Sequence, residues 1–473
     1  SDQAPYNWDA AWLFVKFLNA GTGQWEHARL SNDVYHVAPA GSTISTGRLN
    51  PGAPFNVNNN YGLGVFIHRD ADGSGTFTAS GVQLRWYYGT NGVTYDDIQE
   101  VSVIAIEMVY VPEGSFYVGS SGQEVDHFTN GPANAPFQIT SEAALSVANT
   151  PGSLWTVHIP GVSETFPPPG TLSAAFPKGH GAFYMMKHEV AQQDYVDFLN
   201  TLTRVQQNAR TRTDLAPGVS VVTNRYVMSG TSGQNNRNGI RCAATVPPTA
   251  PVSFYCDLNN NGTGGESNDG QWIACNHLTW SDLAAYLDWC GLRPMTELEY
   301  EKACRGPAFP VNDQYAWGGP GYTLSNGMTG SGTINEASST TGSNASQPVM
   351  RVGAFAAGAT TRAQAGAGYY GALNLSDNVA EWSIPVNDEA SALSPFTGTH
   401  GDGMLSVDGE PNAATWPADG SHLYGFRGAR IGSDLFGDNL WYSGVASRRG
   451  ASHDPGIGEY HWAGGGRGVR RAP

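Results

Sequence analysis

Apolar and polar residues alternate along the first hundred residues, which is the pattern of half-buried β-strands. The run 82–88 alternates strictly and places its valine, leucine, tryptophan and last tyrosine on one face. Apolar runs at 11–18 and 61–68 predict two further strands, and turns rich in Asn, Gly and Ser separate them. We therefore expect an all-β, sandwich-like N-terminal domain that covers residues 1–105.

Three later segments have helical spacing instead. Apolar residues recur every three or four positions in 190–202, and again after Ser281, which we expect to cap the second helix. Thr296 is placed to cap a third helix over 297–303. The pattern therefore predicts helices only in the middle of the chain.

The rest of the chain favours loops. Beyond about residue 306, Gly, Ser, Thr, Asn and Ala dominate, with scattered tyrosines and tryptophans as anchors. The strand-like run 101–111 leads into this part without a flexible linker. We therefore expect an α+β protein, in which the N-terminal domain is followed by a loop-rich domain over 106–473.

Length and charge narrow the possible functions. A chain of 473 residues exceeds what one hydrophobic core usually serves, which agrees with two domains. With 25 basic and 41 acidic side chains, the net charge of −16 argues against nucleic acid or an anionic membrane as partner. No apolar run approaches the roughly 20 residues of a membrane span. Because the chain starts at Ser1 without methionine, we expect a processed, extracellular or cell-surface protein.

All five cysteines lie between residues 242 and 304. Their spacing matches no zinc pattern and includes no CxxC motif, so a thiolate metal site is not expected. In an exported protein, one or two disulfides with one thiol left over is the simplest expectation.

Two loops carry the oxygen-rich pattern of a calcium site. The loop 70–75 has aspartates at alternate positions and a glycine at the sixth, but Gly81 stands where an acidic residue is needed. A hairpin turn is the favoured interpretation there. The loop 257–262 is followed by Glu266 and Asp269 at an unusual offset, and both calcium and a plain turn remain open.

Eight motifs, in order, resemble the formylglycine-generating-enzyme (sulfatase-modifying factor) family. They are MVYVPEGSFYVG (108–119), FYMMKHEV (183–190), HLTWSDLAAYL (277–287), LRPMTELEYEKACRG (292–306), YAWG (315–318), NLSDNVAEW (374–382), FRG (426–428) and GRGVR (466–470). The resemblance implies a variant of the C-type lectin fold. Within it, Arg293, Glu297 and Glu301 fit a fixed arginine–carboxylate network at the start of a helix.

The resemblance also implies a structural calcium ion at 374–382. Carried over by position, Asn374 and Glu381 supply side-chain oxygens, while Asp377 and Val379 supply backbone carbonyls. Such mixed oxygen ligands suit a hard cation. Asp377 stands where the family usually has glycine.

The family's reaction requires two cysteines, five positions apart, that bind copper(I). Leu440 and Val445 stand at the corresponding positions, and no cysteine follows Cys304. Soft thiolates are what copper(I) needs, so we expect no copper and no formylglycine generation. Among the 12 histidines there is no HxxxH arrangement, and the GxSxG, P-loop and HExxH motifs are absent as well.

A non-catalytic scaffold is therefore the main functional hypothesis, as a subunit of a surface assembly or filament in which the N-terminal domain offers an edge strand. The first alternative is a lectin-like display module that binds a glycan or protein, as the variable proteins of diversity-generating retroelements do on this fold. Its candidate ligand-binding residues mix aromatic rings with hydrogen-bonding groups: Trp441, Tyr442, Arg448, Arg449, His453, Tyr460 and Trp462. The second alternative is an oxidoreductase of the family with an unrecognised site.

Overall fold

The computed structural model describes most of the chain. The described residues are 8–124, 126–156, 168–325, 327–339, 344–345, 348–387, 392–419, 421, 423–428, 443–452 and 461–473.

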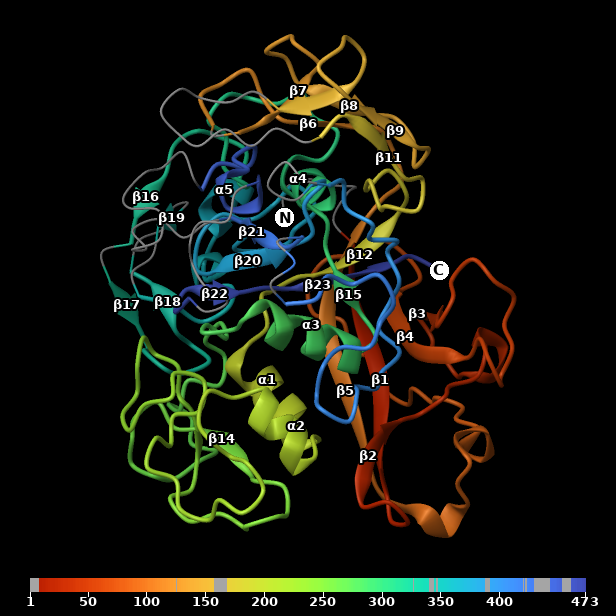
Figure 1. Ribbon diagram of the computed structural model, residues 1–473, viewed down its shortest axis with the longest axis vertical. Helices are drawn as coiled ribbons and strands as arrows, with labels where there is room; N and C mark the ends of the chain where they lie inside the picture. The colour runs from red at the N-terminus through yellow and green to blue at the C-terminus, as the bar shows by residue number, and fades with distance from the viewer. Residues whose placement is uncertain are drawn as a thin grey trace.

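An eight-stranded sheet is the largest sheet of the described structure and runs through its centre (Figure 1). Its strand order is β15-β23-β12-β5-β1-β4-β3, with β2 paired to β1 at one end. The bounds are β1 Asp9–Asn19, β2 Gln24–His27, β3 Ser42–Arg48, β4 Gly62–Arg69, β5 Ile98–Val111, β12 Phe183–Met186, β15 Arg293–Pro294 and β23 Gly468–Arg471. The last strand of the chain thus joins the same sheet as the first.

The predicted strands at 11–18, 61–68 and 101–111 are confirmed as β1, β4 and β5. The strand predicted at 82–88 is wrong, because this run makes only isolated bridges, Gln83 to Val37 and Trp86 to Leu30. It lies against the sheet as a cover: Val82, Leu84 and Trp86 pack on an apolar cluster of β1, β3 and β4. The alternation therefore predicted the inward face correctly for these three residues but not for Tyr88, which is 42% exposed, and it did not predict the pairing.

Six helices are described, and the three predicted ones are among them. The bounds are α1 Gln192–Asn200, α2 Arg204–Ala209, α3 Trp280–Trp289, α4 Glu297–Arg305, α5 Arg362–Ala365 and α6 Arg449–Ser452. Thr296 caps α4 as expected, accepting a hydrogen bond from the Glu299 amide. The cap of α3 is Thr279 rather than Ser281, because Thr279 accepts from the Asp282 amide in a full capping box.

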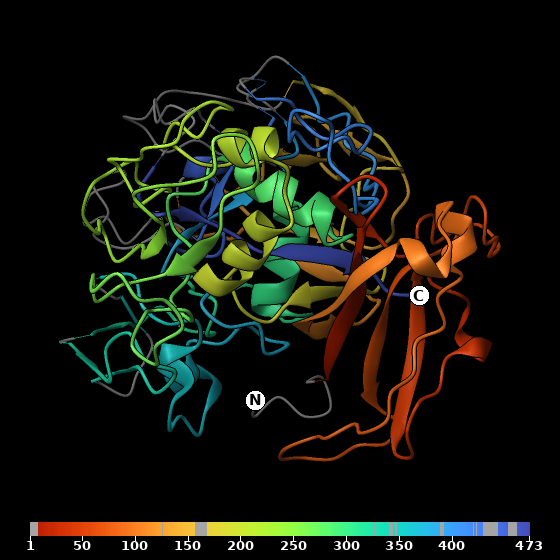
Figure 2. The ribbon, with the colours of Figure 1, turned by 90° about the horizontal axis from the view of Figure 1, so that it is seen from below.

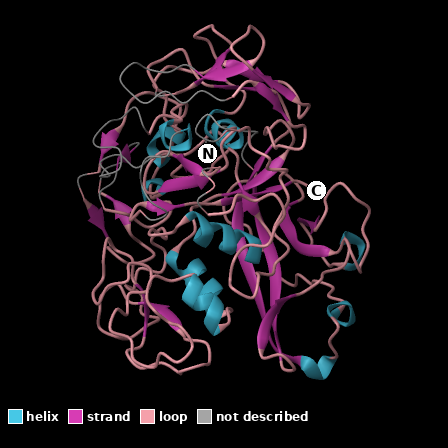
Figure 3. Cartoon of the chain, viewed as in Figure 1, coloured by secondary structure: helices cyan, strands magenta, loops and turns pink. Residues whose placement is uncertain are grey.

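Short strands build several small sheets around this centre, and most of the remaining chain is loop (Figure 3). The bounds are β6 Phe116–Val118, β7 Phe128–Asn130, β8 Phe137–Ile139, β9 Leu145–Val147, β10 Leu154–Thr156, β11 Gly170–Leu172, β13 Ile240–Cys242, β14 Phe254–Cys256, β16 Thr323–Leu324, β17 Met328–Thr329, β18 Ala337–Ser338, β19 Asn344–Ala345, β20 Ala380–Ser383, β21 Gly425–Arg427 and β22 Gly464–Gly465. The fold is mostly sheet with few helices, which is compatible with the expected α+β class.

One face of β1 packs against the later part of the chain. Trp12 and Phe14 are fully buried, Trp12 donates from Nε1 to the Cys290 carbonyl (2.9 Å), and Phe14 meets the Trp289 ring edge-on. Seen from below, the N-terminal strands form one flank and α3 lies beside them (Figure 2). The described strands before residue 105 all belong to the large sheet, and β5 continues through that position. The division at residue 105 stays a prediction.

The expected disulfides are absent. All five cysteines are buried free thiols: Cys242, Cys256, Cys275, Cys290 and Cys304. Four of them lie in one apolar cluster, so they serve as small hydrophobic side chains rather than as crosslinks.

None of the described helices is both long and apolar enough to cross a membrane.

Candidate functional site

Helix α4 brings two glutamates to the centre of the molecule. Glu297 and Glu301 lie one helical turn apart, so their carboxylates project from the same face of α4. Both residues are completely buried. Buried carboxylates require cationic partners, because desolvating an unpaired charge is costly.

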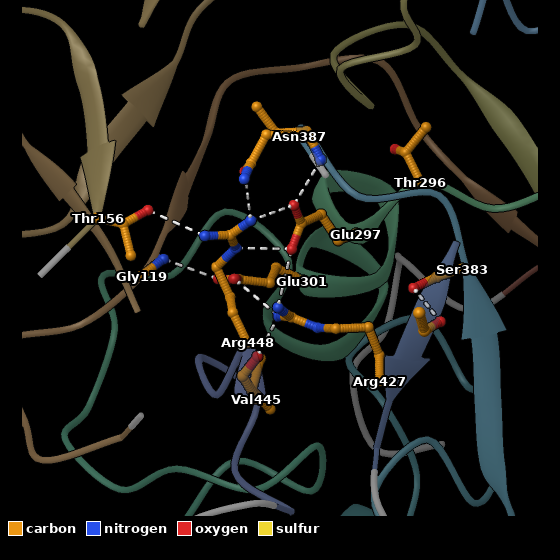
Figure 4. Close-up of polar contacts among 12 residues, drawn as sticks. Gly119, Thr156, Thr296, Glu297, Glu301, Ser383, Asn387, Arg427, Val445 and Arg448 are labelled. Carbon is orange, nitrogen blue, oxygen red and sulfur yellow. Dashed lines mark hydrogen bonds and ion pairs between the residues drawn. The ribbon is translucent and has the colours of Figure 1, made fainter. Parts of the chain in front are cut away.

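Arg448 supplies the first partner (Figure 4). It donates to both oxygens of Glu297, from Nε to Oε2 and from Nη2 to Oε1, each at 2.8 Å. Its remaining donors reach the Thr156 hydroxyl (2.9 Å) and the Asn387 side-chain oxygen (3.1 Å). The guanidinium also stacks on Phe128, with 4.0 Å between its carbon and the ring centroid. A bidentate pair with these extra contacts fixes the orientation of Arg448.

Arg427, on β21, bridges the two glutamates. It donates to Glu297 Oε2 (3.2 Å) and to Glu301 Oε1 (2.8 Å). Glu301 also accepts from Arg305 on its own helix (2.7 Å) and from the Gly119 amide (2.7 Å). We call Glu297, Glu301, Arg305, Arg427 and Arg448 the arginine–glutamate network.

The network predicted from the sequence therefore exists, but with different partners. Arg293 forms its bidentate pair with Glu299, at 2.6 and 2.8 Å, and not with Glu297 or Glu301. Glu299 sits on another side of α4, where it also accepts from the Thr296 amide in the capping box. The motif 426–428 gave the signal for Arg427, but the sequence assigned it no partner.

Val445 lies directly beside the network. Its carbonyl accepts from Arg427 Nη2 (2.7 Å), and its amide donates to the Gln314 carbonyl (2.7 Å). The side chain is fully buried among apolar residues that include Tyr300 and Leu375. The segment that leads to Arg448 is thus held at both backbone and side chains. Leu440, the other position of the missing cysteine pair, lies outside the described residues.

The predicted calcium ligands lie in a tightly wound, buried loop. Asn374, Asp377 and Asn378 all have positive φ, at 60°, 119° and 66°. The Asn374 side-chain oxygen accepts from the Gly353 amide (3.1 Å). Both oxygens of Glu381 accept from Arg467, each at 2.7 Å.

This arrangement fits calcium only in part. Asn374, Asp377 and the backbone at Val379 have the oxygen chemistry that calcium prefers. Glu381, however, is engaged by a guanidinium on both oxygens, so it would have to release one to bind a cation. Nearby Glu189 is buried with Glu381 around the same arginine, and burial raises the pKa of Glu189 to about 8. No group of three or more His, Cys, Asp or Glu in the described ranges is arranged to hold a metal.

The two oxygen-rich loops are held by hydrogen bonds. Asp257 forms an ion pair with Arg241 and accepts from the Asn261 and Gly262 amides, each at 3.0 Å. In the other loop, Arg69 Nη2 donates to the Gly75 carbonyl (3.0 Å). Both loops therefore have the contacts of stabilised turns.

The candidate ligand-binding residues divide into two groups. Four of them lie outside the described residues: Trp441, Tyr442, His453 and Tyr460. Arg448 is buried in the network, which leaves its guanidinium no solvent-facing edge. Arg449 and Trp462 are half-buried, and Trp462 packs against the cluster that contains Val379.

A second aromatic surface lies outside the ligand-binding residues predicted from the sequence. A groove of about 770 Å³ is lined by Val57 and by the consecutive residues 84–90. The Arg85 guanidinium lies over the Tyr87 ring (5.2 Å), and Tyr35 meets the same ring edge-on (6.4 Å). The sequence signal for this surface is the run Trp-Tyr-Tyr at 86–88, which the alternation assigns to a strand instead.

Comparison with known proteins agrees with the motifs. Residues 178–430 match the family described as the sulfatase-modifying factor enzyme 1-like domain. Mouse formylglycine-generating enzyme is 26% identical over 209 residues, which are 42% of this chain and 48% of the enzyme, so the match spans about half of that relative's length. Among solved structures, Treponema denticola variable protein 1 aligns over 78% of this chain and 96% of its own, with 10% identity and a TM-score of 0.31. The chain belongs to the family of the sulfatase-modifying factor enzyme 1-like domain.

Proposed function

We propose that this chain is a non-catalytic member of its family, and that it serves as a structural subunit of an extracellular surface assembly or filament. The observation that supports the absence of catalysis most directly is the tight packing of the segment 443–448. At the position where the resemblance places a copper-binding thiolate, this segment has Val445, whose side chain is buried and whose backbone is bonded on both sides. The segment is thus a packed part of the scaffold.

The thiols that the chain does have are unsuited to the family's chemistry. Metal-binding and nucleophilic cysteines act as thiolates. Burial raises the pKa of Cys242 to about 11 and those of Cys290 and Cys304 to about 12, so these thiols stay protonated near neutral pH. Burial raises the pKa of Cys256 and Cys275 as well.

Copper(I) titration tests the proposal that this chain lacks the family's copper site. The purified chain is expected to bind no stoichiometric copper(I), whereas a matched L440C/V445C variant restores the cysteine spacing and is expected to bind it. Val445→Cys is a near-isosteric change in an apolar site, and an unchanged melting temperature checks that the double variant folds. Stoichiometric copper in the unaltered chain, or oxygen consumption with a cysteine peptide, would overturn the proposal.

The proposed scaffold has a C-type-lectin-like core and one structural calcium ion at 374–381. Asn374, Asp377 and the Val379 carbonyl are the proposed ligands, and Glu381 joins them only by exchanging one oxygen from Arg467. Removal of the ion by a chelator is then expected to lower the melting temperature. The proposed ion is absent if the purified protein contains no calcium and if neither chelator nor added calcium changes the melting temperature.

A glycan-binding display role is the second candidate, and the aromatic groove is the observation that favours it. Tyr87 and Tyr88 offer flat apolar ring faces, and Arg85 offers charged donors at the same concave site. Glycan-array binding that is lost in Y87A/Y88A, and retained when exposed Tyr95 is changed to Ala, would support it. Binding that survives Y87A/Y88A would place recognition elsewhere.

A further inference from the structure

Part of one edge of strand β5 has no strand of the described residues beside it. The strand pairs with β1 from Asp9–Val109 to Leu18–Glu100 and, after an irregularity that leaves out Gln99, again at Asn19–Ile98. On its other side, β12 reaches only Met108 to Val111. In Figure 1 the lower part of this long orange strand accordingly has β1 on one side and no strand on the other. The stretch from Gln99 to Ala105 is a free sheet edge in the described part of the molecule.

The direction of the free backbone groups follows from one hydrogen bond. The Lys187 amide donates to the Glu107 carbonyl (2.9 Å), so the backbone groups of Glu107 point away from β1. These groups alternate along a strand, so those of Val101, Val103 and Ala105 point the same way. No hydrogen bond from another described residue reaches them. This edge therefore offers a row of donors and acceptors to an incoming strand.

The side chains along this edge are unusually apolar for an exposed position. Val101 is 50% exposed and Val103 is 59% exposed. Natural sheets usually protect such edges with charge, proline or a covering segment. Here the only charge between residues 99 and 105 is Glu100, and the valines stand next to open backbone groups.

The edge is complementary to a second copy of itself. An antiparallel pair centred on Ser102 matches the regular part of the free stretch: Glu100 faces Ile104, and Val101 faces Val103. Gln99, at the irregular end of the strand, comes opposite Ala105. Each exposed valine then covers a valine of the other copy, and neither glutamate faces a like charge. A centre one residue later would place Gln99 opposite Glu107, whose outward carbonyl already binds Lys187.

We infer that two copies of this chain associate by antiparallel pairing of their β5 edges about a two-fold axis at Ser102. The partner in the proposed assembly is then a second copy of the chain, and the contact is the β5 edge. The pairing rests on the proposed function only for its role in an assembly, because the dimer could form without one. A two-fold contact of this kind is closed, so growth into a filament requires another interface as well.

A single cysteine tests the register. In the S102C variant, the new thiol lies on the axis opposite its copy, at the close spacing of a non-hydrogen-bonded pair. We expect oxidation to link most of the protein into dimers. The matched variant E100C, two residues along on the same face, should not crosslink, because its copy is about four residues away. Absence of crosslinking in S102C, or equal crosslinking in both variants, would overturn the inference.

A lysine substitution tests the edge independently. V103K is expected to weaken dimerisation at least tenfold in sedimentation equilibrium, while V407K, at an 82% exposed valine elsewhere, leaves it unchanged. Equal melting temperatures show that both variants fold. A monomeric wild type, or a V103K dimer as tight as wild type, would contradict the pairing. If β5 pairing fails but ordered polymers still form, only the pairing is wrong and the proposed assembly stands. If β5 dimers form but no polymers are seen, the pairing stands and the proposed assembly is wrong.

Discussion

For Arg448, the role expected from the sequence differs from the role that the structure shows. Next to aromatic residues and another arginine, it has the look of a surface recognition residue. In the structure it is fully buried and paired with Glu297, which lies 151 residues earlier. The motif pointed to Arg293, only four residues from Glu297, as the cation of the network, but Arg293 pairs with Glu299. The actual partner could not be identified, because several arginines lie close together near the C-terminus. Ion-pair partners are decided by the fold.

Glu297→Gln keeps the shape of the side chain but removes its charge from the network. Arg427 and Arg448 then lose a buried counter-charge, and we expect the free energy of unfolding to fall by about 3–5 kcal/mol. Chemical denaturation measures this. Asp9→Asn, at the half-exposed pair with Lys187, is the control and should cost less than about 1 kcal/mol. Equal small losses in both variants would show that the network is not a main support of the fold.

Lys16 gives a prediction about pH. It is buried, donates to the Gly403 carbonyl (2.6 Å), and burial lowers its pKa from 10.5 to about 7. Between these values the unfolded chain holds the proton and the folded chain does not, so this group makes stability rise with pH. The stability of wild type relative to K16M should therefore increase from pH 7 to pH 10, as followed by denaturation. A constant difference across this range would contradict a titrating Lys16.

At the scale of elements, local signals placed the helices well and the caps less well. Thr296 and the glutamate three residues later form a capping box that can be read directly from the sequence. For α3, both Thr279 and Ser281 are acceptable caps, and only the backbone shows that the helix begins at Trp280. The strand error at 82–88 has a similar cause, because alternation reports a buried face and a buried face does not require a ladder.

The two candidate caps of α3 can be compared directly. Thr279→Ala removes the acceptor for the Asp282 amide and should destabilise the protein by about 1 kcal/mol. Ser281→Ala, inside the helix, should change the stability by less than about 0.5 kcal/mol. Urea denaturation of both variants measures the two losses of stability. A larger loss in Ser281→Ala than in Thr279→Ala would indicate that Ser281 is the cap.

The whole molecule shows what the sequence could not provide. Eight ordered motifs predicted the family, and the missing cysteine pair was visible at once. The large sheet was not predictable, because it joins β5 to β12 and β12 to β23, and pairings over such separations leave no local pattern. Nor did any pattern show that Trp12 packs on the end of α3.

This packing predicts that the N-terminal part depends on the rest. A fragment of residues 1–111 contains β1 to β5 but exposes Trp12, Phe14 and Phe66, which are fully buried in the whole chain. We expect it to show no cooperative thermal transition by circular dichroism, whereas the full chain shows one. A sharp transition in the isolated fragment would instead establish residues 1–105 as an independent domain.

The proposed role as an assembly subunit is tested most directly by negative-stain electron microscopy of native material. We expect ordered polymers with a constant repeat, which this chain forms without added copper. Dispersed single particles under the same native conditions would contradict it.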